Sequence, residues 1–501
     1  MAMQSEALVS LTLYFAAMLA IGVYAYFKTH NDMTGFMLGG RGLSPSVTAL
    51  SAGASDMSGW MLMGLPGALY LSGLASAWIA VGLSVGAYLN YCLVAPRLRI
   101  YTELLDDAVT IPEYFERRFE DQHHLMRLIC ASVIVIFFAI YTTSGVVAGG
   151  KLFEASFGYN YQWGVWITAG VVVAYSTFGG FLAVSTTDFV QGCIMFIALV
   201  LVPLVAVDAM GGFASAHSAI EQVNPDLLLL SGGTALGLIS ALSWGLGYFG
   251  QPHIIVRFMA IQSVAEIATA RRIGMSWMIV TLFGAVAVGL VGVAYVHNRA
   301  ATLADPETVF IYLSTVLFHP VIGGFLLAAI LAAIMSTISS QLLVTSSSLT
   351  SDFYQTFLRR RASQRELVLV GRISVVAVAL LAVVLAQDQT SNVLDLVSNA
   401  WSGFGAAFGP VVLFSLFWRR MTLAGAMAGM VVGASTVLVW TYLPLLGNGA
   451  ALSSVLYEII PGFITNCIAI VVVSLMTQPS PSMEANFARM VDQLNTQLSV
   501  K

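Results

Sequence analysis

Charged side chains are scarce in this sequence. Asp, Glu, Lys and Arg make up 9% of the 501 residues, compared with about a quarter in an average soluble domain, while 58% are hydrophobic. The net charge of −4 gives no basic excess of the kind that binds nucleic acid. The composition therefore excludes an ordinary water-soluble domain, argues against a nucleic-acid partner, and makes the lipid bilayer the expected surroundings.

Paired cysteines and clustered histidines are also missing. The four cysteines, Cys92, Cys130, Cys193 and Cys467, lie singly in apolar stretches, so neither disulfides nor zinc are indicated and we interpret them as packing residues. The seven histidines show no ligand spacing. Since no nucleophile, base and orienting group can be placed together, we do not expect an enzyme, and no obligate protein partner is evident.

Long apolar runs are abundant. Because every backbone N–H and C=O in hydrocarbon must be paired within its own element, runs of about 20 apolar residues predict membrane-spanning α-helices. The pattern predicts an all-α polytopic membrane protein with about thirteen spans. They fall at residues 7–27, 46–72, 76–98, 127–150, 162–182, 189–210, 233–255, 273–296, 321–348, 367–387, 391–418, 422–443 and 454–476.

Lys and Arg are unevenly distributed among the segments that connect these spans. With the N-terminus outside, all 21 Lys and Arg residues except Lys151 and Arg299 face the cytoplasm, as the positive-inside rule requires. The first run is followed, not preceded, by a basic residue, Lys28, which predicts a retained span rather than a cleaved signal. Residues 1–477 then form one membrane domain, and residues 478–501 form a cytoplasmic surface helix or a disordered tail.

Asp56 is the one carboxylate near the middle of an apolar run. Placing it there costs roughly 2.5–3.5 kcal/mol on insertion scales, so something must offset the cost. Small and hydroxyl residues surround it at positions 51–59, with Gly53 and Gly59 close by, as expected where a helix unwinds and turns carbonyls toward a cation. The alternative is a carboxylate that is protonated or satisfied by hydrogen bonds between helices.

The span at 233–255 contains a second predicted interruption. Gly245, Gly247, Gly250 and Pro252 lie within eight residues, which disfavours a continuous helix. Paired interrupted spans in two halves of a chain indicate the binding site of a transporter. They open two candidate five-helix units, 46–210 and 233–418, of inverted topology, with 7–27 and 422–476 peripheral; the alternative is two unrelated glycine-rich packing stretches.

Aromatic and hydroxyl side chains mark further candidate positions. Trp244 and Tyr248 are four residues apart, and Tyr141 is another polar-tipped aromatic at membrane depth, although any one of them could be core packing. Ser336 and Thr337 follow a small-residue stripe and could join the unwound segment near Asp56 in a sodium shell. Ser339 and Ser340, just beyond, are expected to matter much less.

Four sequence segments resemble those of a known family. Residues 53–60, 179–184 with Thr187 and Asp188, 244–253, and 333–337 resemble the proline branch of the sodium/solute symporter family, and the similarity covers roughly residues 5–477. The resemblance implies thirteen helices with a LeuT-like core of two inverted repeats. It also implies a secondary active transporter of the bacterial cytoplasmic (inner) membrane that imports L-proline by symport with Na⁺.

The resemblance further implies a role for each matching residue. The implied sodium ligands are the carbonyls of Ala54, Met57 and Ala333 and the hydroxyls of Ser336 and Thr337. The residues implied in sodium coupling are Ser55, Asp56, Arg41 and Asp188. The implied contacts of proline are Ser58, Gly59, Trp60, Tyr141, Trp244 and Tyr248.

Other functions stay open from the residues alone. One is sodium symport of a different amino acid or small carboxylate, such as pantothenate. Another is a sensor that kept the transporter fold, which the lack of a module after about residue 477 disfavours. A channel is disfavoured because no carbonyl-lined filter motif or charged ring is present.

Overall fold

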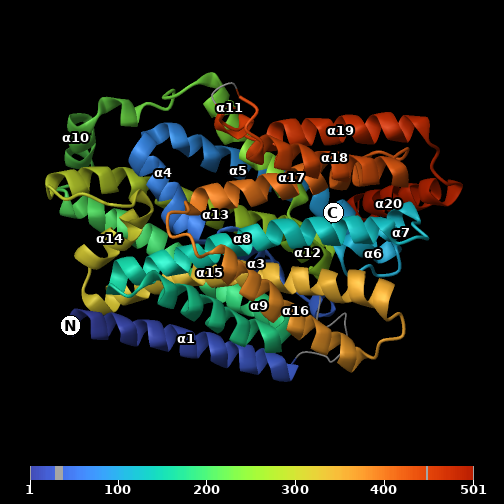
Figure 1. Cartoon of the computed structure of the whole chain (residues 1–501), viewed down its shortest axis with the longest axis horizontal. Coiled ribbons are helices and arrows are strands. Elements are labelled where there is room, and N and C mark those ends of the chain that lie inside the picture. The colour runs from blue at the N-terminus through green and yellow to red at the C-terminus, as the bar shows by residue number, and fades with distance from the viewer. Residues whose placement is uncertain (1, 29–37, 447–448, 500–501) are drawn as a thin grey trace.

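The computed structural model describes residues 2–28, 38–446 and 449–499. Within these residues the backbone is helical and contains no β-strand, only an isolated bridge between Leu43 and Ile261. The long helices lie side by side along the long axis of the molecule (Figure 1). The all-α class predicted from composition is therefore confirmed.

The helices have the following bounds. They are α1 (Ala2–Lys28), η1 (Gly39–Arg41), α3 (Pro45–Asp56), η2 (Trp60–Gly64), α4 (Leu65–Ser72), η3 (Gly73–Ser76), α5 (Ala77–Leu89), η4 (Asn90–Val94), α6 (Ala95–Leu104), α7 (Ile111–Phe119), α8 (Leu125–Phe157), α9 (Tyr161–Ala209), α10 (Phe213–Val223), η5 (Pro225–Leu228), α11 (Ala235–Ser243), η6 (Trp244–Gly250), α12 (Pro252–Ala260), η7 (Val264–Glu266), α13 (Ile267–Asn298), η8 (Pro306–Thr308), α14 (Val309–Val316), α15 (Pro320–Ser347), η9 (Ser348–Leu358), α16 (Gln364–Leu385), α17 (Val393–Phe417), α18 (Leu423–Tyr442), η10 (Leu452–Ser454), α19 (Ile459–Met476) and α20 (Pro481–Ser499).

Ten of the described helical segments are long and apolar enough to cross a membrane, and two shorter apolar helices, Tyr161–Ala174 and Ala235–Gly250, accompany them. The predicted spans 162–182 and 189–210 belong to the single helix α9. This helix is kinked at Gly180, where the backbone leaves helical geometry (φ 60°, ψ −164°). Glycine is needed there because a side chain would clash at this positive φ. The number of thirteen crossings stays a prediction.

The helix through residues 45–72 is interrupted at its centre. α3 begins at the N-cap Ser44 and ends at Asp56, and Met57 leaves helical geometry (φ −81°, ψ 79°). The chain resumes as the π-helix η2, and Pro66 follows as the second residue of α4. Because proline has no N–H, the regular hydrogen-bond ladder cannot run through this point, and a π-helical turn accommodates the defect.

The segment at 235–260 is interrupted as well. α11 gives way to the 3₁₀ segment η6, Gln251 is extended (φ −82°, ψ 104°), and α12 begins at Pro252. Glycine allows η6 to lie directly on α5, since a Cβ at Gly86 would lie only 2.2 Å from the carbonyl oxygen of Gly245. The two interruptions therefore lie in the packed interior of the molecule, although most of α11 is exposed.

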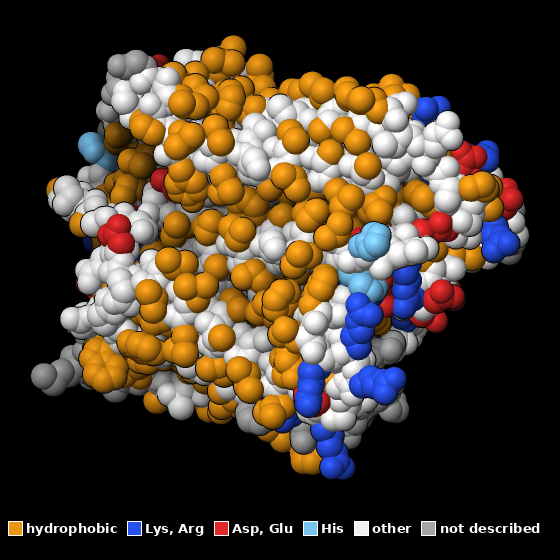
Figure 2. Space-filling model, turned by 45° about the vertical axis from the view of Figure 1, so that its right-hand side comes forward, with side chains coloured by type: hydrophobic (Ala, Val, Ile, Leu, Met, Phe, Trp, Pro, Cys, Tyr) orange, Lys and Arg blue, Asp and Glu red, His pale blue; other side chains and the backbone are white. Residues whose placement is uncertain are grey.

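The remaining helices enclose this centre. α3 packs against α9, α12, α13 and α15, while α18 and α19 pack on each other and on α17. The tail after residue 477, for which a helix and disorder were both open, is the helix α20, held to the domain by an ion pair between Arg419 and Glu484 (2.6 Å). Figure 2 shows apolar side chains over much of the face in view and Lys and Arg gathered at the end where α7 and α20 lie.

Candidate functional site

The unwound end of α3 gathers three aromatic side chains around Asp56. The Tyr248 hydroxyl donates a hydrogen bond to the Asp56 carboxylate. The backbone carbonyl of Asp56 accepts from the Tyr141 hydroxyl (3.2 Å) and from the indole N–H of Trp60 (3.1 Å). All four side chains are buried. The structure thus brings together residues predicted separately from three spans.

Trp244 joins this cluster through its neighbours. Its ring centroid lies 6.4 Å from that of Trp60, and it stacks on Tyr457 at 5.4 Å with 27° between the ring planes. The indole N–H of Trp401 donates to the carbonyl of Trp244 (2.8 Å). Trp244 and Tyr248 both lie in the 3₁₀ segment η6.

The residues between Asp56 and Trp60 are fixed by backbone contacts. The Ser58 N–H donates to the carbonyl of Asp56 (2.9 Å), and a Cβ at Gly59 would lie 2.9 Å from that of Ala148. Ser55 bonds to a carbonyl one turn earlier in its own helix (3.1 Å). This segment therefore keeps a compact turn in which glycine is required by the approach of α8.

Oxygen atoms of α3 and α15 converge at Ala54, two residues before Asp56. The Ser336 hydroxyl donates to the carbonyl of Ala54 (2.7 Å) and contacts that of Ala333 (3.1 Å), and the Thr337 hydroxyl lies 3.4 Å from the Ala54 carbonyl. The last carbonyls of a helix have no partner within it, so the end of α3 makes the Ala54 oxygen available. Four of the five oxygens implied for sodium meet here, and the fifth, from Met57, is at the adjoining interruption.

Asp188 lies in a separate buried network. Its carboxylate forms an ion pair with Arg257 (3.2 Å) and accepts from the Ser51 hydroxyl (2.7 Å). Arg257 also donates to Ser51 (3.1 Å) and to Ser340 (2.5 Å). All four residues have 0% exposed surface. The network joins α3, α9, α12 and α15 one turn from Ser336.

This network corrects two sequence expectations. Arg257 was assigned to the cytoplasmic face but is buried against Asp188. Ser340 contacts that ion pair, while the smaller effect on sodium expected for Ser339 and Ser340 stays a prediction. Asp56 is also not the only buried membrane carboxylate, because Asp188 is buried equally. Periodicity could not show this, since the partners come from helices far apart in sequence.

Arg41 lies away from this centre. It donates to the carbonyls of Met259 (2.7 Å) and Ala108 (3.0 Å) and forms an ion pair with Asp107 (3.3 Å). The implied sodium-coupling residue therefore ties the segment before α3 to the end of α12, and within the described residues it forms no hydrogen bond or ion pair with Asp56 or Ser336. Any influence on sodium must act through these connections.

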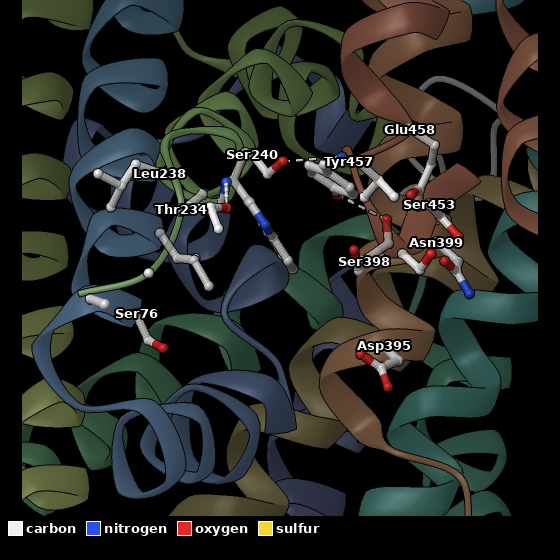
Figure 3. Close-up of a pocket in the computed structure, with 18 of the residues that line it drawn as sticks. Ser76, Thr234, Leu238, Ser240, Asp395, Ser398, Asn399, Ser453, Tyr457 and Glu458 are labelled. Carbon is white, nitrogen blue, oxygen red and sulfur yellow. Dashed lines mark hydrogen bonds between the residues drawn. The ribbon is translucent and has the colours of Figure 1, made fainter. Parts of the chain in front are cut away.

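An open cavity of about 720 Å³ reaches Trp244 from the surface. Figure 3 shows Thr234 and Leu238 of the α11 region across from Asp395 and Glu458. α11 begins at this cavity and α12 ends beside Arg41, so the cavity and the Arg41 contacts lie at opposite ends of one interrupted segment. The cavity therefore reaches the edge of the aromatic cluster, at Trp244, from the α11 side.

Sequence reasoning missed two residues of this region, Trp401 and Tyr457. Trp401 stands among small residues of α17 with no local feature that separates it from core packing. Tyr457 precedes Glu458, a carboxylate near the start of the predicted span 454–476. In the structure Glu458 has 2% exposed surface. A carboxylate inside an apolar run was the signal available in the sequence.

Two interrupted helices that meet at buried aromatic and oxygen groups define a secondary transporter. The profile of the Sodium:solute symporter family matches residues 36–433, and the chain belongs to this family. It is 57% identical over 477 residues (95% of this chain, 96% of the relative) to the osmoregulated proline transporter OpuE of Bacillus subtilis. It is 58% identical to the high-affinity proline transporter PutP of the same organism (94% and 98%) and 52% identical to a sodium/proline symporter of Staphylococcus aureus (97% and 95%).

Solved structures show the same fold at low sequence identity. A Na⁺-coupled sialic acid symporter in a substrate-bound outward-open state superposes with a TM-score of 0.80 at 19% identity, covering 95% of this chain and 98% of that one. Mhp1, a nucleobase-cation-symport-1 family transporter, gives 0.57 at 13% identity (90% and 98%). The LeuT-like fold that the resemblance implied is confirmed, and the relatives are transporters, not enzymes.

The buried Asp188–Arg257 pair gives a stability prediction. Arg257→Met alone leaves the Asp188 carboxylate buried without its cation, and we expect it to cost about 3–5 kcal/mol of unfolding free energy. Asp188→Leu with Arg257→Met replaces both charges by apolar groups and should recover most of that loss. Thermal unfolding of the purified protein measures both, with the exposed Arg420→Met as control. A double variant as unstable as Arg257→Met would contradict the pairing.

Proposed function

We propose that this protein imports L-proline by symport with Na⁺, alternating access around the unwound end of α3. The observation that carries the proposal is the meeting of uncharged oxygens from Ala54, Ser336 and Thr337 beside a buried aromatic cluster at Asp56. Relatives at 52–58% identity over nearly the whole chain are named as proline transporters or sodium/proline symporters, which supports the choice of solute.

Sodium would be bound by the carbonyls of Ala54, Met57 and Ala333 and the hydroxyls of Ser336 and Thr337. Such a shell carries no formal charge, which suits a weakly held, exchangeable monovalent ion. Releasing Na⁺ to the cell must be possible in each cycle, so weak binding is an advantage. Ser55, Asp56, Arg41 and Asp188 would influence sodium without all being ligands.

Proline would lie beside the interruption that follows Asp56. Its carboxylate suits the N–H groups where helical backbone resumes near Ser58 and Gly59, and its secondary ammonium suits exposed carbonyls. Its apolar ring would pack among Trp60, Tyr141, Trp244 and Tyr248. The cavity at Trp244 would be the entry path.

One sodium ion supplies enough energy for this transport. Moving one charge down 100 mV contributes about 2.3 kcal/mol, and a tenfold sodium gradient adds about 1.4 kcal/mol. Together these support a few-hundredfold accumulation of solute. A single ion per proline would suffice.

The basic end of the molecule supports an orientation in the membrane. We propose a multi-pass protein of the bacterial cytoplasmic membrane with residues 1–477 as one domain, units 46–210 and 233–418 inverted, the N-terminus outside and α20 in the cytoplasm. The Lys and Arg side chains gathered near α7 and α20 support this by the positive-inside rule (Figure 2).

Cysteine labelling in intact cells tests this orientation. A membrane-impermeant maleimide should react with Ser454→Cys, at the open cavity, and should reach Ser482→Cys of α20 only after the cells are permeabilised. The variants are made in a chain whose four native cysteines are replaced. Labelling of Ser482→Cys first would reverse the proposed topology.

Uptake in proteoliposomes tests the transport function. Radiolabelled proline should accumulate when an inward sodium gradient is imposed and should not when K⁺ replaces Na⁺. Excess unlabelled proline should abolish uptake, whereas stronger competition by another amino acid or by pantothenate would reassign the solute. A protein that binds proline without moving it would fit a sensor instead.

The hydroxyl ligands are tested by substitution. Ser336→Ala with Thr337→Ala removes two oxygens from the sodium shell, and each contact to a charged group is worth about 1.5–3 kcal/mol, so the sodium concentration for half-maximal uptake should rise more than tenfold. Ser346→Ala, in the same helix and bonded only to its own turn, serves as control. Equal effects of both changes would indicate helix packing rather than sodium binding.

A further inference from the structure

A second, small cavity borders Asp56. It has a volume of about 20 Å³ and lies between α3, the junction of α5 with η4, the η6–α12 segment and α13. None of its lining residues belongs to α15, which carries Ser336 and Thr337. A cavity needs about 10–15 Å³ to hold one water-sized particle, so this space fits a single small ion or water and is far too small for proline.

Three buried oxygen atoms of the lining residues have no hydrogen-bond partner in the described part of the chain. They are Oδ1 of Asp56, Oδ1 of Asn90 and the hydroxyl of Tyr91. The three residues have 1%, 1% and 6% exposed surface. Unpartnered polar atoms are costly in a dry interior, and three around one cavity indicate an occupant that they share.

The surrounding fold holds these oxygens in place. Asn90 begins the π-helix η4, and its amide N–H donates to the carbonyl of Tyr248 (3.0 Å), which leaves Oδ1 as the free end of the side chain. The Tyr91 ring packs against Phe258 with centroids 4.8 Å apart. π-Helical turns occur frequently at functional sites, and here one places two oxygen-bearing residues side by side.

The lack of a cationic partner for Asp56 among the described residues is the second observation that points to a cation. Its carboxylate receives a hydrogen bond from Tyr248, but no Lys, Arg or His of the described residues forms an ion pair with it or lines the cavity. Asp188, by contrast, has Arg257. A buried carboxylate without a cationic partner is strongly disfavoured, and a bound monovalent cation would neutralise it.

We infer that this cavity is a position for one dehydrated sodium ion, with Asp56, Asn90 and Tyr91 as its side-chain ligands, separate from the uncharged set of Ala54, Ser336 and Thr337. The inference rests on the proposed sodium symport. It gives Asp56 a direct part in sodium binding, although its carboxylate does not belong to the uncharged set. Because Ala54 and Asp56 share the last turn of α3, the two positions lie on one helix end.

The test removes one ligand atom. Tyr91→Phe deletes the hydroxyl and keeps the ring that packs on Phe258, whereas Tyr101→Phe deletes another buried, unpartnered hydroxyl remote from the cavity. Binding of ²²Na⁺ to purified protein is measured without proline. Tyr91→Phe should weaken sodium binding about tenfold and Tyr101→Phe should leave it unchanged. Equal affinities in wild type and Tyr91→Phe would overturn the inference.

A second variant and a second readout separate the remaining outcomes. Asn90→Ala should weaken ²²Na⁺ binding in the same direction, and unchanged melting temperatures must show that both variants are folded. If Tyr91→Phe alters only the pH dependence of the protein and leaves sodium affinity intact, the cavity holds a proton or water and the inference fails. Wild-type protein that binds ²²Na⁺ but does not transport proline would refute the proposed solute, and the inferred cation position would still stand.

Discussion

The interruption of α3 at Met57 is the constraint on which the rest of the site depends. A backbone that leaves the helix inside a membrane exposes carbonyls that no water can satisfy. Here side chains from other helices do so: Ser336 and Thr337 at the carbonyl of Ala54, and Tyr141 and Trp60 at that of Asp56. The groups that make the break tolerable are the same groups that can bind an ion and a solute.

Two buried carboxylates show two ways of offsetting charge in this interior. Asp188 is compensated by Arg257, with Ser51 and Ser340 completing a network that connects α3, α9, α12 and α15. Asp56 has a phenol as partner, while its own Oδ1 and two neighbouring oxygens, from Asn90 and Tyr91, have no partner in the described part of the chain. A charge compensated by a mobile ion can report whether that ion is present, which a transporter requires.

The two ends of the α11–α12 segment are arranged differently. At one end a cavity of about 720 Å³ reaches Trp244, whose ring stacks on Tyr457 of the periphery. At the other end, Arg41 and the backbone bridge between Leu43 and Ile261 join the start of α3 to the end of α12. Alternating access would require the first end to close and these contacts to separate.

The sequence by itself determined the helical membrane class, the positions of most spans and both interruptions, because apolar runs, glycine and proline act on the backbone locally. It also indicated Asp56, Tyr141, Tyr248, Ser336 and Thr337, which the structure brings together. Only the tertiary structure decided that Arg257 is buried with Asp188, that Tyr457 stacks on Trp244, and that Asn90 and Tyr91 face the same cavity as Asp56. Those relations join residues tens to hundreds of positions apart, and helix packing, which no local pattern encodes, sets them.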